Sequence, residues 1–150
     1  MFDITVSELM NRTVRTIGCD TTVLEAATKL YDHDIGSLVV VDNGAHPVGI
    51  VTKSDINMVV AEDETPNEVA VRTVMSSPPI CVGATDTIHD AAELMQEHSI
   101  KKLPVTDEEG TLVGVLTAGD LAYYLPTYAK RIHSRRPARK TDHAVLERLA

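Results

Sequence analysis

Residues 49–55 read Gly-Ile-Val-Thr-Lys-Ser-Asp, and 65 residues later positions 114–120 read Gly-Val-Leu-Thr-Ala-Gly-Asp. The match extends outward without a gap, so that residues 6–57 align with residues 71–122 and 15 of the 52 aligned positions are identical. A duplicated unit of this size predicts two copies that bury their open faces against each other. We therefore expect a pseudo-twofold repeat fold with clefts in related pairs.

Each copy carries the same order of predicted elements. In the first, a helical turn at 6–10 and a brief strand near 14–17 precede a helix opened by Thr22-Val23-Leu24-Glu25, a capping box. A hairpin follows, with strands at 37–41 and 48–51 around a turn at 42–44, and then a helix from about 54 to 61. The second copy repeats this with a helix capped at Thr87, a hairpin over 103–116 and a helix from near 119 toward Tyr128.

The predicted fold class is therefore α/β (α+β), built from two β-α-β-β-α repeats. We assign residues 6–61 to repeat 1, residues 62–70 to an acidic, proline-broken linker, residues 71–128 to repeat 2, and residues 129–150 to a basic C-terminal extension.

Charge is distributed unevenly along the chain. Residues 130–150 hold seven basic and two acidic side chains, so they carry +5, and the total of −8 leaves −13 on residues 1–129. A hydrophobic content of 43% is enough for a folded core. No apolar run approaches the roughly 20 residues that span a bilayer, and the N-terminus lacks a secretory pattern. We expect a cytoplasmic protein with no membrane partner.

The sequence contains no arrangement typical of catalysis or metal binding. It has no G-x-S-x-G, no P-loop lysine and no nucleophile with an ordered base. Its six histidines are scattered, without a metal-ligand spacing on a helix, and the two cysteines form no C-x-x-C pair. We therefore expect no enzyme activity, no catalytic residue, no catalytic cofactor and no metal site.

Both hairpins end in Gly-x-x-Thr-x-x-Asp, at a predicted strand-to-helix junction. A helix N-terminus attracts anions, and a carboxylate one turn in can accept hydrogen bonds from ribose hydroxyls. The pair therefore suits a ribose-phosphate. Thr-x-x-Asp is equally a capping box in its own right, and on spacing alone plain capping is the favoured interpretation.

The complete pattern resembles a tandem pair of CBS (cystathionine β-synthase) domains, also called a Bateman module. The resemblance rests on the ungapped duplication, the Val-x-x-x-Met openings, the capped helix, the Asp/Gly hairpin and the closing Gly-x-x-Thr-x-x-Asp, and it covers residues 6 to about 125. It implies a non-catalytic regulatory module that binds AMP, ADP, ATP or S-adenosylmethionine in clefts between the two repeats.

The resemblance also implies which residues line the two clefts. One would combine the Thr and Asp of repeat 2 with the first strand and post-helix segment of repeat 1: Thr117, Asp120, Thr13, Val14, Thr16, Ile35, Gly36 and Ser37. The other would combine Thr52, Asp55, Pro79, Ile80, Cys81, Ile100, Lys101, Lys102 and Pro104. The two ammonium groups favour charged nucleotides in the second cleft.

We thus expect an adenosine-binding sensor that forms a homodimer and signals to a protein partner. An alternative is a nucleic-acid-associated regulator whose basic extension, residues 130–140, contacts phosphates. Two features argue against a nucleic-acid partner. Residues 1–129 carry a net charge of −13, which repels the phosphates of a duplex, and an aromatic content of 3% leaves few side chains for base stacking.

Overall fold

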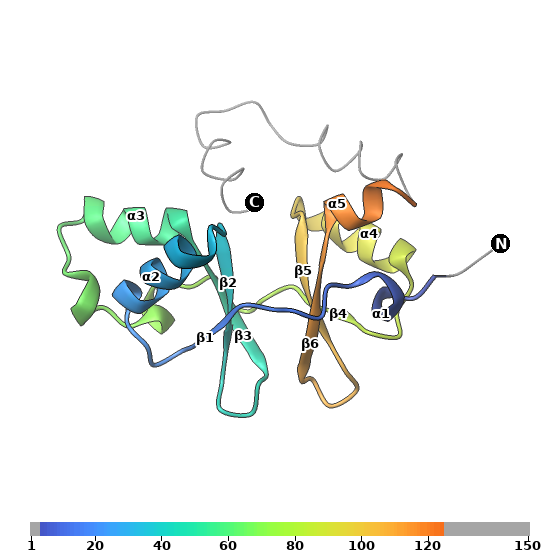
Figure 1. Cartoon of the computed structure of the whole chain (residues 1–150), viewed down its shortest axis with the longest axis horizontal. Coiled ribbons are helices and arrows are strands. Elements are labelled where there is room, and N and C mark those ends of the chain that lie inside the picture. Colours follow the sequence, from blue (N-terminus) through green and yellow to red (C-terminus); the bar gives the residue numbers. More distant parts are fainter. Residues whose placement is uncertain (1–3, 125–150) are drawn as a thin grey trace. The chain divides into compact units, whose positions relative to one another are not determined.

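The structure, a computed structural model, describes residues 4–124 of the 150-residue chain (Figure 1). These residues form two compact units. The N-unit consists of residues 15–79, and the C-unit consists of residues 4–14 together with residues 80–124. Each unit contains one β-α-β-β-α series, which confirms the predicted fold class.

The N-unit contains a three-stranded sheet with two helices. Its elements are β1 (Thr16–Gly18), α2 (Val23–His33), β2 (Ser37–Val41), β3 (Pro47–Thr52) and α3 (Lys53–Ala61). β1 runs parallel to β2, so that α2 is the crossover between them, and β2 and β3 form an antiparallel hairpin. Alternate residues of β2, Leu38 and Val40, share a core with Ala26 and Leu30 of α2. The side chains that alternate along the strand and those that recur about every 3.6 residues along the helix thus pack together in one apolar layer.

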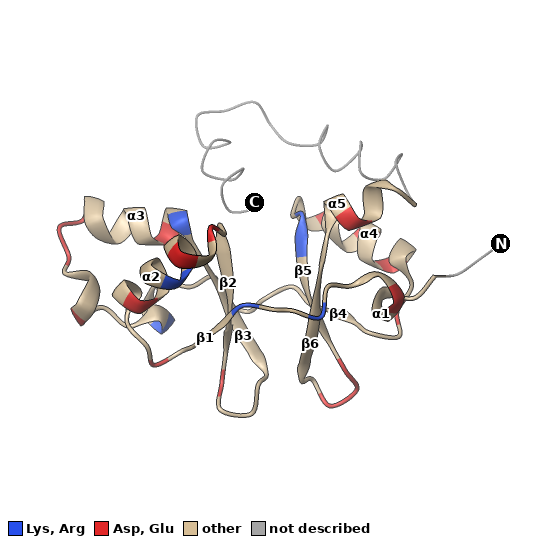
Figure 2. Cartoon of the chain, viewed as in Figure 1, with Lys and Arg blue, Asp and Glu red and all other residues tan. Residues whose placement is uncertain are grey.

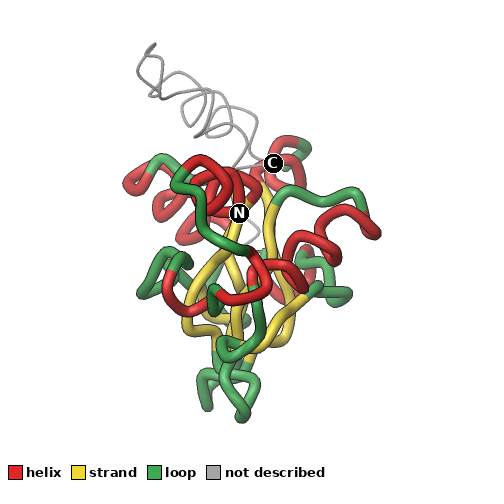
Figure 3. The backbone as a smooth tube through the Cα atoms, turned by 90° about the vertical axis from the view of Figure 1, so that its left-hand side faces the viewer, coloured by secondary structure: helices red, strands yellow, loops and turns green. Residues whose placement is uncertain are grey.

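The C-unit repeats this plan. Its elements are β4 (Val82–Gly83), α4 (Ile88–His98), β5 (Lys102–Thr106), β6 (Leu112–Thr117) and α5 (Ala118–Ala122). β4 pairs parallel with β5, and β5 pairs antiparallel with β6. Each unit therefore presents one hairpin, drawn as paired yellow strands in Figure 3. The predicted continuation of the last helix beyond residue 124 and the basic extension lie outside the described residues.

Threonine caps open the long helices as the sequence predicts. Thr87 and Asp90 form a complete capping box on α4, since Thr87 Oγ1 accepts from the Asp90 N–H and an Asp90 oxygen accepts from the Thr87 N–H, both at 3.1 Å. On α2 only half of the expected box forms. Thr22 Oγ1 accepts from the Glu25 N–H (3.1 Å), but the exposed Glu25 makes no return bond among the described contacts.

The opening segment of repeat 1 packs in the C-unit, with the second repeat. Val6, in α1 (Val6–Leu9), and Met10 belong to the C-unit core. Asn11 and Val115 of β6 exchange two backbone hydrogen bonds, at 2.8 and 2.9 Å. The absence of a side chain at Gly114 permits this approach, because a Cβ there would lie 2.5 Å from Met10 Sδ.

The opening segment of repeat 2 packs in the N-unit in the same way. It follows one short 3₁₀ turn, η1 (Pro66–Glu68), and begins with a second, η2 (Val71–Thr73). Val71 is fully buried in the N-unit core, and Ser76 exchanges backbone hydrogen bonds with Ile50 of β3 at 2.9 and 3.0 Å. The boundaries of the sequence repeats therefore differ from those of the compact units, because the opening segment of each repeat packs in the unit that contains the hairpin of the other repeat. Within residues 4–124, no helix combines the length and apolarity needed to cross a membrane.

Candidate functional site

A buried threonine–aspartate pair lies at the junction of β3 and α3 in the N-unit. Thr52 ends β3 in extended conformation and caps α3. Asp55 Oδ2 accepts from the Thr52 N–H (2.8 Å) and from Thr52 Oγ1 (3.0 Å), and the Asp55 N–H donates to Thr52 Oγ1 (3.3 Å). Both side chains are almost completely buried, at 3% and 2% exposed. The hydroxyl and carboxylate are therefore held in one geometry by the backbone of the first helical turn.

The post-helix segment of the same repeat lies beside this pair. Ser37, the first residue of β2, is paired in register with Thr52 and is 4% exposed. The Gly36 carbonyl accepts a hydrogen bond from the Lys53 N–H (3.2 Å), which is the first amide of α3. The N-unit thus brings Gly36, Ser37, Thr52 and Asp55 together at one edge of its sheet.

The other predicted residues of the N-unit are Ile35, Thr16 and Pro79. Ile35 follows the left-handed residue Asp34, donates its N–H to the Leu30 carbonyl (3.0 Å) and packs against the N-unit core. Thr16 begins β1 opposite Val39, and its carbonyl accepts from Lys29 Nζ (2.6 Å). Pro79 is half-buried at the end of the unit. The register partner of Thr16 in β2 is Val39, two residues after Ser37.

The C-unit holds the equivalent pair at the junction of β6 and α5. Asp120 Oδ2 accepts from the Thr117 N–H (2.9 Å), and the Asp120 N–H donates to Thr117 Oγ1 (3.2 Å). Both residues are half-buried, in contrast to the buried pair of the N-unit. Asp120 Oδ1 accepts no hydrogen bond from residues 4–124.

Two lysines border the pair of the C-unit. Lys102 begins β5 in register with Thr117, and the Lys101 carbonyl accepts from the Ala118 N–H (2.8 Å). Figure 2 shows this basic segment at the start of β5. Burial lowers the pKa of Lys102 below its ordinary value of 10.5, because desolvation disfavours the ammonium form. The C-unit therefore combines a cation, a hydroxyl and a carboxylate, where the N-unit has Ser37 in place of the cation.

The other predicted residues of the C-unit occupy its sheet and its entry segments. Ile100 donates its N–H to the Met95 carbonyl (2.9 Å) and, with Ile80, packs against the core. Pro104 is buried in β5 opposite Val115. Cys81 is half-buried beside β4, and desolvation raises the pKa of its thiol above 9.0. Finally, the exposed Thr13 donates its N–H to Asn11 Oδ1 (2.9 Å), and the half-buried Val14 follows it.

Sequence reasoning did not bring each pair together with the post-helix segment of its own repeat. The signal was available, because counting back from each hairpin turn sets Ser37 opposite Thr52 and Lys102 opposite Thr117. The combinations across repeats that the family resemblance implies stay predictions. Within residues 4–124, no group of three metal-ligating side chains is assembled. The alternative function rests on residues 130–140, which lie outside the described part of the chain.

Comparison with known proteins places the chain in a defined group. A family model described as the CBS domain matches residues 6–69 and again residues 71–127. The uncharacterized protein MK0525 of Methanopyrus kandleri is 35% identical over 127 residues, which is 84% of this chain and 65% of that protein. This chain thus matches slightly less than two thirds of MK0525. The CBS domain-containing protein YhcV of Bacillus subtilis is 32% identical over 117 residues, 78% of this chain and 82% of that one.

A solved structure extends the likeness to three dimensions. It is a CBS domain protein, PAE2072, from Pyrobaculum aerophilum, complexed with AMP. The two sequences are 33% identical, the TM-score is 0.74, and the match covers 85% of this chain and 99% of that one.

Proposed function

The chain belongs to the CBS domain family, and on that premise we propose that it is a non-catalytic regulatory module that binds an adenosine-containing ligand. The candidates are AMP, ADP, ATP and S-adenosylmethionine. The similar protein in complex with AMP supports the adenosine class. The threonine–aspartate pair of each unit would hold the ribose and phosphate, Lys101 and Lys102 would stand near a phosphate, and the other predicted site residues would surround the base.

One observation carries the proposal, the half-buried carboxylate of Asp120. Its Oδ2 is fixed by Thr117, and its Oδ1 accepts no hydrogen bond within the described residues. A carboxylate held in this way is oriented before a ligand arrives, so it can accept from two ribose hydroxyls at little entropic cost. The neighbouring Lys102 would offer an ammonium group to a phosphate.

The pair of the N-unit has the same groups in a more enclosed setting. Asp55 Oδ2 already accepts from both the N–H and the hydroxyl of Thr52, and the pair is nearly inaccessible. We therefore propose that the two pairs differ in affinity, and that Asp120 contributes more to binding than Asp55.

The test is a thermal-shift and calorimetric titration with AMP, ADP, ATP, S-adenosylmethionine and NAD. A ligand at 100 times its dissociation constant should stabilise the fold by about 2.7 kcal/mol. Asp120→Asn should abolish most of that shift for the ligand that binds. Asp90→Asn is the matched control, because Asp90 caps α4 through the same threonine–aspartate geometry and is exposed. If Asp120→Asn and Asp90→Asn lose equal ligand affinity, Asp120 acts only as a helix cap and does not contact the ligand.

The partner of the lysines can be resolved by a double-mutant cycle. The family resemblance combines Lys102 with Asp55, whereas hairpin register sets Lys102 opposite Thr117 in its own unit. Lys102→Met is combined with Asp120→Asn and, separately, with Asp55→Asn, and ligand affinity is measured for each. The aspartate that acts on the same phosphate site as Lys102 should show a non-additive effect of 0.5 kcal/mol or more, as an order-of-magnitude threshold.

We further propose that the module is a cytoplasmic homodimer whose ligand-bound state is recognised by a protein partner. The absence of a catalytic motif in the sequence supports a sensing role, because ligand binding would then act by shifting a conformational or an association equilibrium. Sedimentation with and without AMP tests the assembly. A monomer under both conditions, at concentrations where AMP is bound, would exclude the homodimer.

A further inference from the structure

One backbone carbonyl of β1 points out of the sheet of the N-unit. The strand order is β1-β2-β3, so β1 is an edge strand. Thr16 pairs in register with Val39, and the hydrogen bond between the strands at this point runs from the Val39 N–H to the Arg15 carbonyl (3.3 Å). Successive residues of a strand direct their backbone groups to opposite sides. The Thr16 carbonyl therefore points away from β2, toward the edge at which β1 pairs with no described strand.

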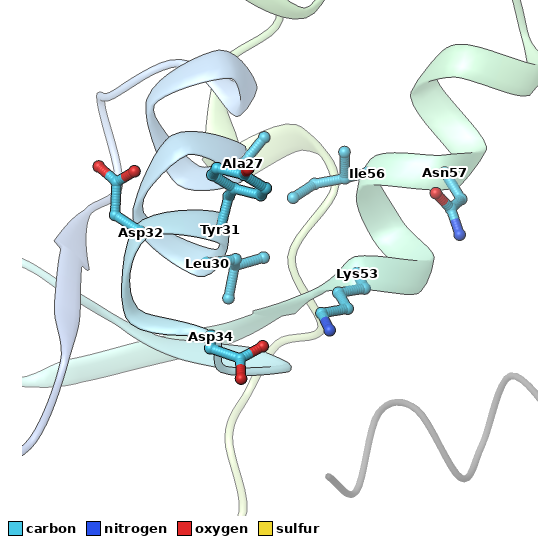
Figure 4. A pocket seen from close by; sticks show the side chains of 8 residues that line it. All are labelled: Ala27, Leu30, Tyr31, Asp32, Asp34, Lys53, Ile56 and Asn57. Carbon is cyan, nitrogen blue, oxygen red and sulfur yellow. The ribbon is translucent and has the colours of Figure 1, made fainter.

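Lys29 of α2 binds this outward carbonyl. Its Nζ donates to the Thr16 carbonyl oxygen at 2.6 Å, a hydrogen bond strengthened by the charge of the donor. The neighbouring Ala26 and Leu30 face the core of the N-unit, so Lys29 lies on the flank of the helix. An open pocket lies between α2 and α3 (Figure 4), and Lys29 takes no part in its lining. The ammonium group is thus directed at β1 and not at α3.

The bond to Thr16 leaves the ammonium group with hydrogen-bonding capacity. An ammonium group carries three N–H donors, and this bond uses one of them. Lys29 is exposed, and its side chain makes no other hydrogen bond or ion pair among residues 4–124, so the remaining donors are accessible to a ligand. A bare strand edge would offer a carbonyl acceptor at this point, whereas the edge of β1 offers a positively charged donor.

The C-unit has no equivalent of this lysine. At the 65-residue offset, Thr16 corresponds to Cys81 and Lys29 corresponds to Leu94, which packs against the C-unit core and has no side-chain donor. The cation is therefore specific to the N-unit. Sequence reasoning did not assign Lys29 to a site, because it lies 13 residues from Thr16 and outside the motifs that the two repeats share.

We propose that Lys29 is a binding residue of the adenosine site and donates a hydrogen bond to a ring nitrogen of adenine. The inference rests on the proposed function, in which Thr16 lies beside the base. Adenine offers ring nitrogens as acceptors and an exocyclic amino group as a donor. The amino group would have to displace Lys29 from the Thr16 carbonyl, whereas a ring nitrogen can accept from the ammonium group while that bond persists. Because Thr16 already orients the ammonium group, less conformational entropy is lost on binding.

The test combines a substitution of Lys29 with single-atom changes of the ligand. Calorimetric titrations compare AMP with 1-deaza-AMP, 3-deaza-AMP and 7-deaza-AMP, each of which replaces one ring nitrogen by C–H and keeps the amino group and the phosphate. The unmodified chain should bind one of these analogues about tenfold more weakly than AMP, as expected for the loss of a hydrogen bond from a charged donor. Lys29→Met should bind AMP about tenfold more weakly, and should no longer distinguish AMP from that analogue.

Two further variants separate binding from a structural effect. Lys29→Arg keeps a charged donor and should restore the discrimination against the same analogue. Leu94→Met is the matched control, because it places the same side chain at the equivalent position of the C-unit, and it should leave AMP affinity unchanged. Equal weakening of all four ligands in Lys29→Met, or no weakening, would overturn this inference and leave adenosine binding intact. A failure of the unmodified chain to bind AMP would also overturn it, and silence across the whole ligand panel would overturn the proposed function as well.

Discussion

Replacing Gly49 by alanine tests whether the opening segment of repeat 2 lies against the hairpin of the N-unit. A Cβ at this position would lie 2.5 Å from Met75 Sδ and 2.9 Å from the Ser76 carbonyl oxygen. The methionine side chain can turn aside, because it is flexible. The Ser76 backbone cannot, because its carbonyl accepts from the Ile50 N–H at 3.0 Å. Overpacking by one methyl group costs about 1–3 kcal/mol.

We therefore expect Gly49→Ala to lower the free energy of unfolding by about 2 kcal/mol, which corresponds to a melting temperature roughly 4–8 °C lower for a chain of this length. Urea unfolding followed by circular dichroism measures it. Gly18→Ala is the control, since a Cβ there would meet Thr21 Cγ2 at an ordinary 3.7 Å. Combining Gly49→Ala with Met75→Ala should cost less than the sum of the two single changes. If the Gly49→Ala and Gly18→Ala variants have the same free energy of unfolding, the inference that residues 71–76 pack against β3 is wrong.

Three further outcomes follow from the geometry of the two pairs and from burial. Asp55→Ala should destabilise the fold more than Asp120→Ala in denaturant titrations, with about 1–3 kcal/mol expected for the buried, triply bonded pair and about 0.5–2 kcal/mol for the half-buried cap. Equal costs would contradict the difference in burial. Because burial lowers the pKa of Lys102 in the folded state, the unfolded chain binds more protons between that lowered pKa and 10.5, so stability should rise with pH across this window. In the Lys102→Met variant, the free energy of unfolding should no longer rise with pH across this window. If it rises with pH as steeply as in the unmodified protein, Lys102 is not the cause. Burial raises the pKa of Cys81, so alkylation by iodoacetamide, followed by mass spectrometry, should be slower at this thiol in the folded protein than in the unfolded chain.

Local signals in the sequence were sufficient for the elements and the fold class. The capped helices at Thr22 and Thr87 and the two hairpins appear where their turn residues and apolar spacing predict them. These features depend on contacts within a few residues, which a single sequence displays directly. The half-formed box at Glu25 is an exception at the level of one side chain, and exposure does not explain it, because the equally exposed Asp90 completes its box on α4.

The exchange of the opening segments could not be predicted in this way. Val6 and Val71, like Met10 and Met75, are the same residue types in equivalent positions, so either segment fits either hairpin by sequence. The choice is made by tertiary packing against β3 and β6. The difference in exposure between Asp55 and Asp120 could not be predicted either, since both residues stand at the same place in Gly-x-x-Thr-x-x-Asp.

The exchanged openings also mean that one repeat is not a self-sufficient folding unit. A chain ending after residue 61 would keep α1 but lose Val71 and the Ser76 pairing that complete its own core. Such a fragment would have to borrow the opening segment of a second fragment, which is domain swapping between identical chains. Joining two repeats in tandem makes that exchange intramolecular, so that assembly of the cores no longer depends on protein concentration. The duplication thus converts a dimerisation requirement into a property of one chain.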